Sequence, residues 1–320
     1  MSARRIGVVL AVLLAASACG GGDDAADSTT TPSTVTSTTA ADPTTVPTTA
    51  APTTTVPPTT TEPTTTVAPE PTTTTTAPPR LVDVKVYFFR GERLEIAHRD
   101  VEAPAVLRGA ISAVLDGPTD SERAADLTSV IPAGTALRDV SLADGQAIVD
   151  LNREFESGGG TASMQGRLGQ IVFTATQFDD VDRVLFWLEG APVDYFGGEG
   201  IELSEPQTRN DVPRWFTGGV IIDAPEPGAT VRSPFTVTGE GDLFEGYSAM
   251  WVWRDGERIA GPFGVNAGAW GNWDEFETVV ELDVGPGPIT LIVDDGGGCT
   301  PGDPECGEPN PAIVDVTLVE

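Results

Sequence analysis

The feature that most limits how this chain can fold is a threonine- and proline-rich segment at residues 23–79. Its 57 residues include 25 Thr and 11 Pro and almost no large apolar side chain. Such a segment cannot bury enough apolar surface to offset the conformational entropy that folding removes. We therefore expect a disordered stalk, able to reach on the order of 150 Å if extended, with folded structure beginning only near residue 80.

The residues before this stalk have the pattern of an export signal. Two arginines precede an apolar run over residues 6–18, which is too short to span a bilayer comfortably. The sequence Ala-Ser-Ala directly before Cys19 resembles the lipobox of bacterial lipoproteins, although Ala16 stands where that box usually has Leu. We predict a signal peptide at 1–18, lipidated Cys19 and stalk at 19–79, and an extracytoplasmic protein anchored to the cell membrane. Cleavage that leaves Cys19 as a free thiol is the alternative.

The charge balance narrows the choice of partners. The formal net charge is −30 at pH 7, and it becomes −32 if residues 1–18 and their two arginines are removed. A surface this acidic repels phosphate backbones, so nucleic acid is excluded as a partner. The same surface attracts cations and basic partners.

Hydrophobic periodicity beyond the stalk predicts an α+β domain over residues 81–203. Pro104 is placed to begin its first helix and Gly117 to end it, and Thr161 or Ser163 is expected to cap the second. The order strand, helix, hairpin, helix, strand favours helices packed on one face of a sheet. The elements are expected near residues 81–89, 104–116, 137–151, 161–178 and 183–190.

One acidic stretch in this domain, "AIVDLNREFESGGG" at 147–160, has the residue types of a catalytic site. Glycoside hydrolysis uses two carboxyl groups across a cleft, and Asp150, Glu154 and Glu156 are the candidates. Acidic residues are abundant throughout the chain, so their clustering here says little. We interpret the stretch as a strand ending near Leu151, with Asp150 pointing outward, followed by a turn in which Phe155 closes over the core.

The last third of the chain has a different pattern. A polar, Pro- and Gly-containing linker is expected at 204–216. Residues 217–320 then show seven short strand candidates separated by turn residues and no helical periodicity, which is typical of a β-sandwich. Trp251 and Trp253 should point to the same face of one strand.

The motifs of the first domain resemble the GerMN domain of spore-germination and sporulation proteins. The match covers about residues 82–203 and rests on the ordered series "VYFF", "HRDV", "LDGP", "IPAGTALRDVSLADGQAIVDLNREF" and "FTATQFDDVDRVLFWLEG". This family implies an extracytoplasmic lipoprotein with no enzymatic activity and no cofactor, related to ring-building modules of envelope assemblies.

The second domain resembles the immunoglobulin-like domain found beside GerMN domains. Two departures stand out: Glu240 replaces a small residue usual after Gly239, and the loop from Gly297 to Pro309 resembles an insertion. Either could alter a contact specific to this family. The residues that carry the resemblance are Pro227, Gly228, Val231, Ser233, Pro234, Phe235, Val237, Gly239, Phe244, Glu245 and Gly246.

That inserted loop contains Cys299 and Cys306 with no histidine nearby, so a zinc site would lack soft ligands. A disulfide is the better interpretation, and it would stabilise the loop by ~2.5 kcal/mol in the chain-entropy model. Carboxylates in and beside the loop are ligands of the kind calcium takes, but their spacing fits no defined calcium motif, so no metal site is predicted. They are Asp294, Asp295, Asp303 and Glu305.

Three further residues are candidates for a functional role. Trp270 and Trp273 lie in the loop-like sequence "GAWGNW", where exposed rings could contact a carbohydrate or a partner protein. His98 is the only histidine, so any Ser-His-Asp or Cys-His triad would have to use it; no nucleophile motif accompanies it, and we interpret it as a surface loop residue.

The sequence as a whole favours a non-enzymatic surface lipoprotein that mediates contacts with envelope proteins or the cell wall. A peptidoglycan or polysaccharide binder that uses the Trp-rich second domain is the main alternative. A cell-wall glycoside hydrolase is the less favoured one.

Overall fold

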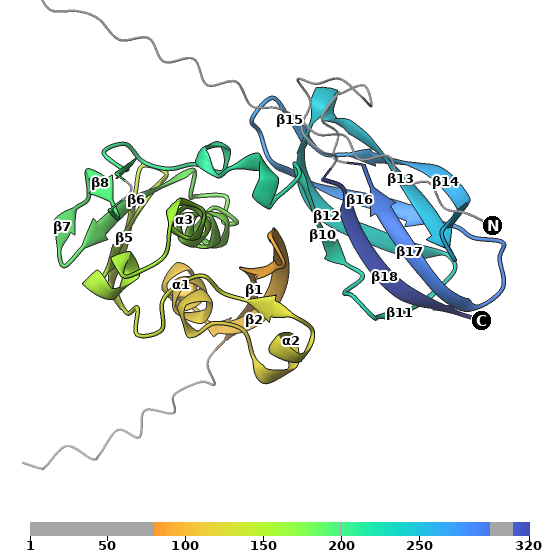
Figure 1. Ribbon diagram of the computed structural model, residues 1–320, viewed down its shortest axis with the longest axis horizontal. Helices are drawn as coiled ribbons and strands as arrows, with labels where there is room; N and C mark the ends of the chain where they lie inside the picture. Colours follow the sequence, from red (N-terminus) through yellow and green to blue (C-terminus); the bar gives the residue numbers. More distant parts are fainter. Residues whose placement is uncertain (1–79, 199, 295–309) are drawn as a thin grey trace, which may run out of the picture. The chain divides into compact units, whose positions relative to one another are not determined.

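The computed structural model describes residues 80–198, 200–294 and 310–320, which belong to one compact unit of the chain (Figure 1). No helix in these ranges is long and apolar enough to cross a membrane. An α+β domain is followed by a β-sandwich domain, which confirms the predicted fold class.

The first sheet is a long antiparallel hairpin with one short added strand. β1 (Leu81–Arg90) pairs along its whole length with β2 (Arg93–Glu102), and β3 (Leu127–Thr128) pairs with the other edge of β1. β2 was not predicted, because charged and polar residues interrupt its apolar positions Leu94, Ile96, Ala97 and Val101. The loop interpretation of His98 was therefore wrong, since His98 lies within β2.

The second sheet has the order β4–β5–β6–β7. The predicted hairpin is confirmed: β4 and β5 are antiparallel, with Val140 opposite Val149, and Asp144 and Gly145 turn between them with positive φ. β6 lies parallel to β5 on its other edge. The strands are β4 (Leu137–Ala143), β5 (Gln146–Leu151), β6 (Arg183–Leu188) and β7 (Ala191–Pro192), followed by the small pair β8 (Tyr195–Phe196) and β9 (Ile201–Glu202).

The helices of the first domain are α1 (Val106–Asp116), α2 (Asp120–Ala124) and α3 (Thr161–Ala175). α1 ends at Gly117, whose φ of 78° suits glycine, as the sequence predicted. α3 begins one residue earlier than a Thr161 cap would require, because Gly160 is its N-cap and no side chain caps it. The cap prediction for Thr161 or Ser163 was wrong.

The layers also differ from the prediction of helices on one face of a single sheet. Figure 1 shows α3 between the two sheets, and one hydrophobic cluster joins residues of both sheets to it. Even polar side chains of α3 are buried, because they satisfy backbone groups of neighbouring elements. Gln170 donates from Nε2 to the Tyr87 carbonyl at 2.8 Å, and Arg167 donates to the carbonyl of fully buried Phe155 at 2.8 Å.

The second domain is a sandwich of two sheets. One has β10, β12 and β16 with the short β15 beside β12, and the other has the order β11–β18–β17–β13–β14. All seven predicted strands are present, and β11 and β15 are additional. The strands are β10 (Val220–Ala224), β11 (Thr230–Arg232), β12 (Phe235–Leu243), β13 (Tyr247–Arg254), β14 (Glu257–Asn266), β15 (Gly268–Ala269), β16 (Asp274–Val280), β17 (Gly287–Val293) and β18 (Ala312–Val319).

Alternation along β13 places its two tryptophans as predicted. Met250 and Val252 are fully buried in the sandwich core, whereas Trp251 and Trp253 lie on the opposite face and are half-buried. The guanidinium of Arg258 lies 3.6 Å from the Trp251 ring centre. This cation–π contact occupies the tryptophan face on this side of the sheet.

The segment between the domains is ordered by its own contacts. Two 3-10 turns, η2 (Arg209–Asp211) and η3 (Arg214–Phe216), follow Thr208, which forms a capping box with Asp211. Buried Phe216 packs edge-on against Phe89 of β1, with ring centres 5.1 Å apart. The stretch at 204–216 therefore joins the core of the first domain.

Candidate functional site

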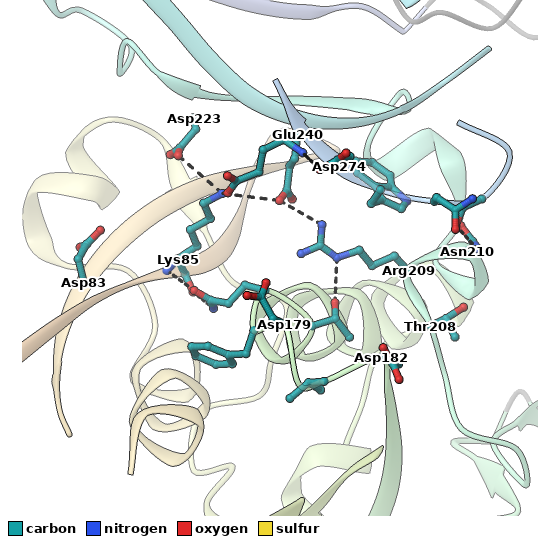
Figure 2. Close-up of a pocket in the computed structure, with 18 of the residues that line it drawn as sticks. Asp83, Lys85, Asp179, Asp182, Thr208, Arg209, Asn210, Asp223, Glu240 and Asp274 are labelled. Atoms are coloured by element: carbon teal, nitrogen blue, oxygen red, sulfur yellow. Dashed lines mark hydrogen bonds and ion pairs between the residues drawn. The ribbon is translucent and has the colours of Figure 1, made fainter. Parts of the chain in front are cut away.

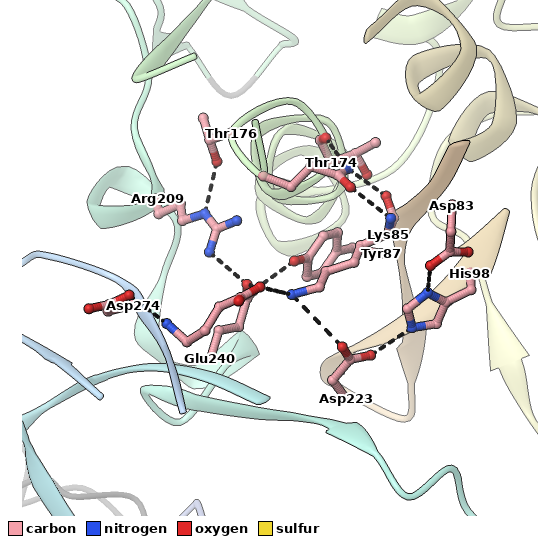
Figure 3. Close-up of polar contacts among 12 residues, drawn as sticks. Asp83, Lys85, Tyr87, His98, Thr174, Thr176, Arg209, Asp223, Glu240 and Asp274 are labelled. Atoms are coloured by element: carbon pink, nitrogen blue, oxygen red, sulfur yellow. Dashed lines mark hydrogen bonds and ion pairs between the residues drawn. The ribbon is translucent and has the colours of Figure 1, made fainter. Parts of the chain in front are cut away.

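Alternation along β1 creates a polar surface where the two domains meet. Asp83, Lys85 and Tyr87 point to one side, while Val84 and Val86 are buried on the other. Opposite them lie Asp223 of β10 and Glu240 of β12 (Figure 3). We call the contacts between these groups the junction network.

Glu240 is the central acceptor of the junction network. Its residue surface is only 3% exposed, so its carboxylate must be satisfied by protein groups. The Tyr87 hydroxyl donates to Oε1 at 2.7 Å, and the Arg209 guanidinium lies 3.1 Å from Oε2. Lys85 Nζ adds a more distant charge at 3.8 Å. All three partners come from elements before the second domain, so this carboxylate ties the two domains together.

The protonation states follow from burial and charge. Burial and the neighbouring Glu240 charge raise the pKa of Tyr87 well above its usual value, so the phenol is a neutral donor. Burial alone would lower the pKa of Arg209 and of Lys85. Neighbouring groups together outweigh burial in both cases: Glu240, Glu275 and Asp223 for Lys85, and Glu240 with Tyr87 for Arg209. Both pKa values are therefore raised, and both groups stay positively charged.

Lys85 has its shortest contact with a residue of β16. Its Nζ donates to Glu275 Oε1 at 2.7 Å and lies 3.8 Å from Asp223 Oδ2. The Lys85 side chain is 16% exposed, whereas that of Glu275 is 76% exposed. The ammonium group is therefore held at the inner edge of the junction, while one of its acceptors reaches toward solvent.

His98 bridges the domains on the neighbouring strand. Its Nδ1 lies 2.7 Å from Asp83 Oδ2, and its Nε2 lies 2.7 Å from Asp223 Oδ1. The hydrogen bond to Asp223, reinforced by Asp83, outweighs partial burial and raises the pKa of His98 to about 9. Burial would raise the pKa of Asp223, but its contacts with His98 and Lys85 lower it. At neutral pH both ring nitrogens therefore donate to carboxylates.

Trp273 anchors the second domain in the first. Its ring meets Phe173 of α3 edge-on, with ring centres 5.0 Å apart, and it packs against the hydrophobic core of the first domain. The Arg209 guanidinium lies 4.7 Å from the Phe173 ring centre and 5.8 Å from that of Trp273, and it donates from Nε to Thr176 at 2.8 Å. Arg209 therefore combines a buried ion pair with cation–π contacts.

The structure separates the two tryptophans that the sequence grouped as contact candidates. Trp270 is 73% exposed and has φ 57°, a conformation that is strained for a bulky residue. Its only ring partner in the described residues is Phe244, at 5.4 Å between ring centres and itself 46% exposed. Trp273 points inward, so Trp270 and Phe244 make the exposed aromatic pair.

A cavity of about 880 Å³ opens beside the junction network (Figure 2). Its walls come from β1 and β2, the end of α3 and the turn after it, the connecting segment, and β10, β12 and the Gly271–Glu275 segment. Seven carboxylates and three basic side chains line it. These are Asp83, Asp179, Asp182, Asp223, Glu240, Asp274 and Glu275, with Lys85, His98 and Arg209.

The carboxylates considered for glycoside hydrolysis have other positions. Asp150 accepts from the Gly190 N–H at 3.0 Å and lies 3.5 Å from Arg138, so it is buried and not outward-pointing as predicted. Glu154 accepts from Ser157, and Glu156 accepts from the Gly197 N–H. None of the three lines the 880 Å³ cavity or the second cavity of about 300 Å³ between β2 and β10.

Several predicted sites lie outside the described residues. They include the signal peptide, Cys19 and the stalk, together with Cys299 and Cys306 and the loop acids at 295, 303 and 305. Asp294 is described, and its carboxylate accepts from Trp251 Nε1 at 3.1 Å. In the part of the chain that the structure covers, no three His, Cys, Asp or Glu side chains are grouped to hold a metal ion.

Comparison with protein families identifies both domains. Residues 85–194 match the Germane family, described as sporulation and spore germination. Residues 219–296 match Gmad2, described as the immunoglobulin-like domain of bacterial spore germination. The chain joins a Germane domain to a Gmad2 domain. No curated protein matches its sequence.

Solved structures with related domains are distant. A Clostridium perfringens protein provisionally named a lipoprotein is 23% identical with TM-score 0.32, over 44% of this chain and 97% of that one. The first GerMN domain of the sporulation protein GerM from Bacillus subtilis is 20% identical with TM-score 0.33, over 40% and 98%. The tandem GerMN domains of the same protein are 16% identical with TM-score 0.36, over 63% and 62%.

The junction network is the part of the Germane–Gmad2 unit that sequence reasoning missed. The signal for Glu240 was present, because an acidic residue replaces the small one usual after Gly239. That glycine leaves no room for a Cβ, which would lie 2.3 Å from the Ile221 carbonyl oxygen. Tyr87 and Arg209 gave no comparable signal, since nothing in the sequence links them to β12.

The first prediction concerns the pH dependence of His98. Its pKa is raised from 6.5 to about 9, so its contribution to stability is complete below pH 6.5 and is lost as pH rises through about 9. Solvent screening reduces its size, because the side chain is 35% exposed. NMR titration of this single histidine should give a pKa near 9, and Asp223→Asn should move it toward 6.5.

A stability measurement gives an independent check of the same prediction. The difference in urea midpoint between the wild type and His98→Gln should shrink between pH 6.5 and pH 10. An equal difference at both pH values, or a histidine pKa close to 6.5 in the wild type, would show that the bridge is not formed.

The second prediction concerns Glu240. Glu240→Gln leaves Arg209 and Lys85 without their buried counter-charge and should destabilise the protein by about 3–5 kcal/mol. Lys85 is the only lysine, so its reaction with an amine-directed reagent, followed by peptide mass spectrometry, reports opening of the junction. Its labelling rate should rise in Glu240→Gln. The matched control is Glu277→Gln, on the exposed side of β16. It should change neither the free energy of unfolding nor the labelling rate of Lys85. Equal changes in the two variants would refute the role of Glu240.

Proposed function

We propose that the chain is a non-enzymatic lipoprotein of the bacterial envelope, anchored at Cys19, whose Germane and Gmad2 domains together contact an envelope protein or the cell wall. The sequence supports the anchor through the apolar run before Ala-Ser-Ala-Cys and the stalk that follows it. A single acyl chain binds a membrane only marginally, and the diacylglycerol that lipoprotein processing adds provides a second.

The observation that carries a binding role is how the polar groups of the junction are used. Lys85, Tyr87, Arg209 and His98 each contact a carboxylate of the Gmad2 domain. Groups engaged in this way act as structural ties. The two domains therefore offer a joint surface to a partner, which suits an adaptor better than a catalyst.

The anchoring part of the proposal has a direct test in cells. Cys19→Ala should abolish incorporation of labelled fatty acid and move the protein from the membrane fraction to the soluble fraction. The double variant Cys299→Ala/Cys306→Ala removes the other two cysteines of the chain and should remain in the membrane. Wild-type protein found in the medium with an unmodified Cys19 would exclude the anchor.

A second candidate function is binding to cell-wall polysaccharide, and the exposed Phe244–Trp270 pair favours it. Trp270 is 73% exposed and Phe244 46%, and their rings meet edge to face, so the open face of the indole offers an apolar surface of the kind that suits the face of a sugar ring. Strain at Trp270 strengthens this interpretation, because such strain is concentrated at functional positions.

Co-sedimentation with purified cell wall tests this second function. Trp270→Ala should weaken binding by about fivefold to tenfold if the ring stacks on sugar. Trp215→Ala removes another exposed tryptophan, 56% accessible and on η3, and should leave binding unchanged. Binding that survives both substitutions would rule out a Trp270 platform.

A further inference from the structure

The turn that carries Trp270 has a conformation that most side chains avoid. It spans residues 269–272 and is closed by the N–H and Nδ2 groups of Asn272, which donate to the Ala269 carbonyl at 3.1 Å and 3.0 Å. Its central residues, Trp270 and Gly271, have φ values of 57° and 86°, which is the pattern of a type I′ turn. Glycine, asparagine and aspartate favour these positions, so the turn keeps a strained residue whose ring is 73% exposed.

Side chains from two parts of the chain hold this turn at Gly271. The Gly271 N–H donates to Asp242 Oδ1 on β12 at 3.0 Å, and its carbonyl accepts from Asn210 Nδ2 at 2.7 Å. A Cβ at Gly271 would lie 2.8 Å from that Asn210 nitrogen, so the close approach requires glycine here. The peptide groups on both sides of Gly271 are therefore fixed, and the first of them joins Gly271 to Trp270.

Asn210 is itself held in place beside the junction network. Arg209, the residue before it in η2, lies 3.1 Å from Glu240 Oε2. Asp211, the residue after it, accepts from the Thr208 N–H at 2.8 Å. Asn210 is exposed, so its substitution removes a hydrogen bond without opening the core. The contacts that join the two domains therefore also set where Asn210 meets the turn.

Phe244, the second ring of the exposed pair, is placed in a different way. β15 runs parallel to β12, with Leu243 opposite Ala269. The residues that follow this pair, Phe244 and Trp270, therefore lie side by side, with ring centres 5.4 Å apart. This strand pairing lies within the Gmad2 domain, whereas Trp270 also depends on Asn210. A ring held in this way before a ligand arrives loses less freedom on binding, which favours affinity.

We propose that Asn210 is a positioning residue for Trp270, so that the connecting segment completes the aromatic binding site of the Gmad2 domain. The inference rests on the proposed binding of cell-wall polysaccharide for the identity of the ligand. Asn210 acts through Gly271 and does not need to touch a sugar. Without its hydrogen bond, the positive φ of Trp270 is held by fewer contacts, and the turn relaxes toward conformations that suit a bulky residue. Binding must then reorder the ring.

The experiment uses the purified full chain and two measurements. The first is the NMR signal of the Trp270 indole N–H, identified by its absence in Trp270→Ala, together with its heteronuclear NOE, which reports motion of the ring on the ps–ns timescale. The second is co-sedimentation with purified cell wall. Asn210→Ala should shift the Trp270 signal, lower its NOE and weaken cell-wall binding by about threefold, because ordering one freed side chain has a moderate cost.

The matched control is Asn152→Ala in the Germane domain. Asn152 Nδ2 donates to the Gly134 carbonyl at 2.9 Å, so this variant also removes a hydrogen bond from an asparagine amide to a glycine carbonyl, but in the loop that precedes β4. It should change neither the Trp270 signal nor cell-wall binding. Changes confined to Asn210→Ala would support the proposal.

Three results would overturn the proposal. One is an unchanged Trp270 signal in Asn210→Ala, and another is an equal change in Asn152→Ala, which would mean a general loosening of the fold. The third is cell-wall binding that falls in Trp270→Ala but not in Asn210→Ala. If Trp270→Ala itself leaves binding unchanged, the polysaccharide function fails, and the NMR comparison still decides whether Asn210 positions the ring.

Discussion

The buried carboxylate of Glu240 is the constraint on which the junction of the two domains depends. A charge removed from water in this way is tolerated only when donors and counter-charges surround it. Tyr87 and Arg209 supply these from the Germane side and the connecting segment, and Lys85 adds a weaker contact. The position of β12 relative to β1 is therefore fixed by electrostatics as well as by the packing of Trp273 on Phe173.

Local sequence patterns predicted helices, turns and strands correctly where neighbouring residues determine the structure. The helix ending at Gly117, the hairpin turning at Gly145 and the seven strands of the sandwich all follow from periodicity and turn chemistry. Buried Phe155 also lies where the sequence placed it. In each case the residues that decide the structure are close together in the chain.

Prediction from the sequence failed where the structure depends on contacts between residues that are far apart in the chain. β2 was not predicted, because one of its faces carries charged side chains whose partners lie in the second domain. His98, for example, contacts Asp223 of β10. Asp150 was expected to face solvent, but Arg138 and the turn after β6 cover it. Glu240 stood out as unusual, yet its partners lie about 30 and 150 positions earlier in the chain. Contacts between residues so far apart in the chain produce no local sequence pattern.

The Glu240 arrangement also limits how these domains can be recombined. A Gmad2 domain carrying this glutamate, if joined to a Germane domain and a connecting segment that lack the equivalents of Tyr87 and Arg209, would bury an unneutralised carboxylate at the new junction. Conversely, this Germane domain and its connecting segment beside a Gmad2 domain with a small residue at that position would leave the buried Arg209 guanidinium without its counter-ion. Substitutions at Glu240 and at its partners are therefore coupled. Exchanging one domain between relatives requires matching substitutions at the residues that contact it.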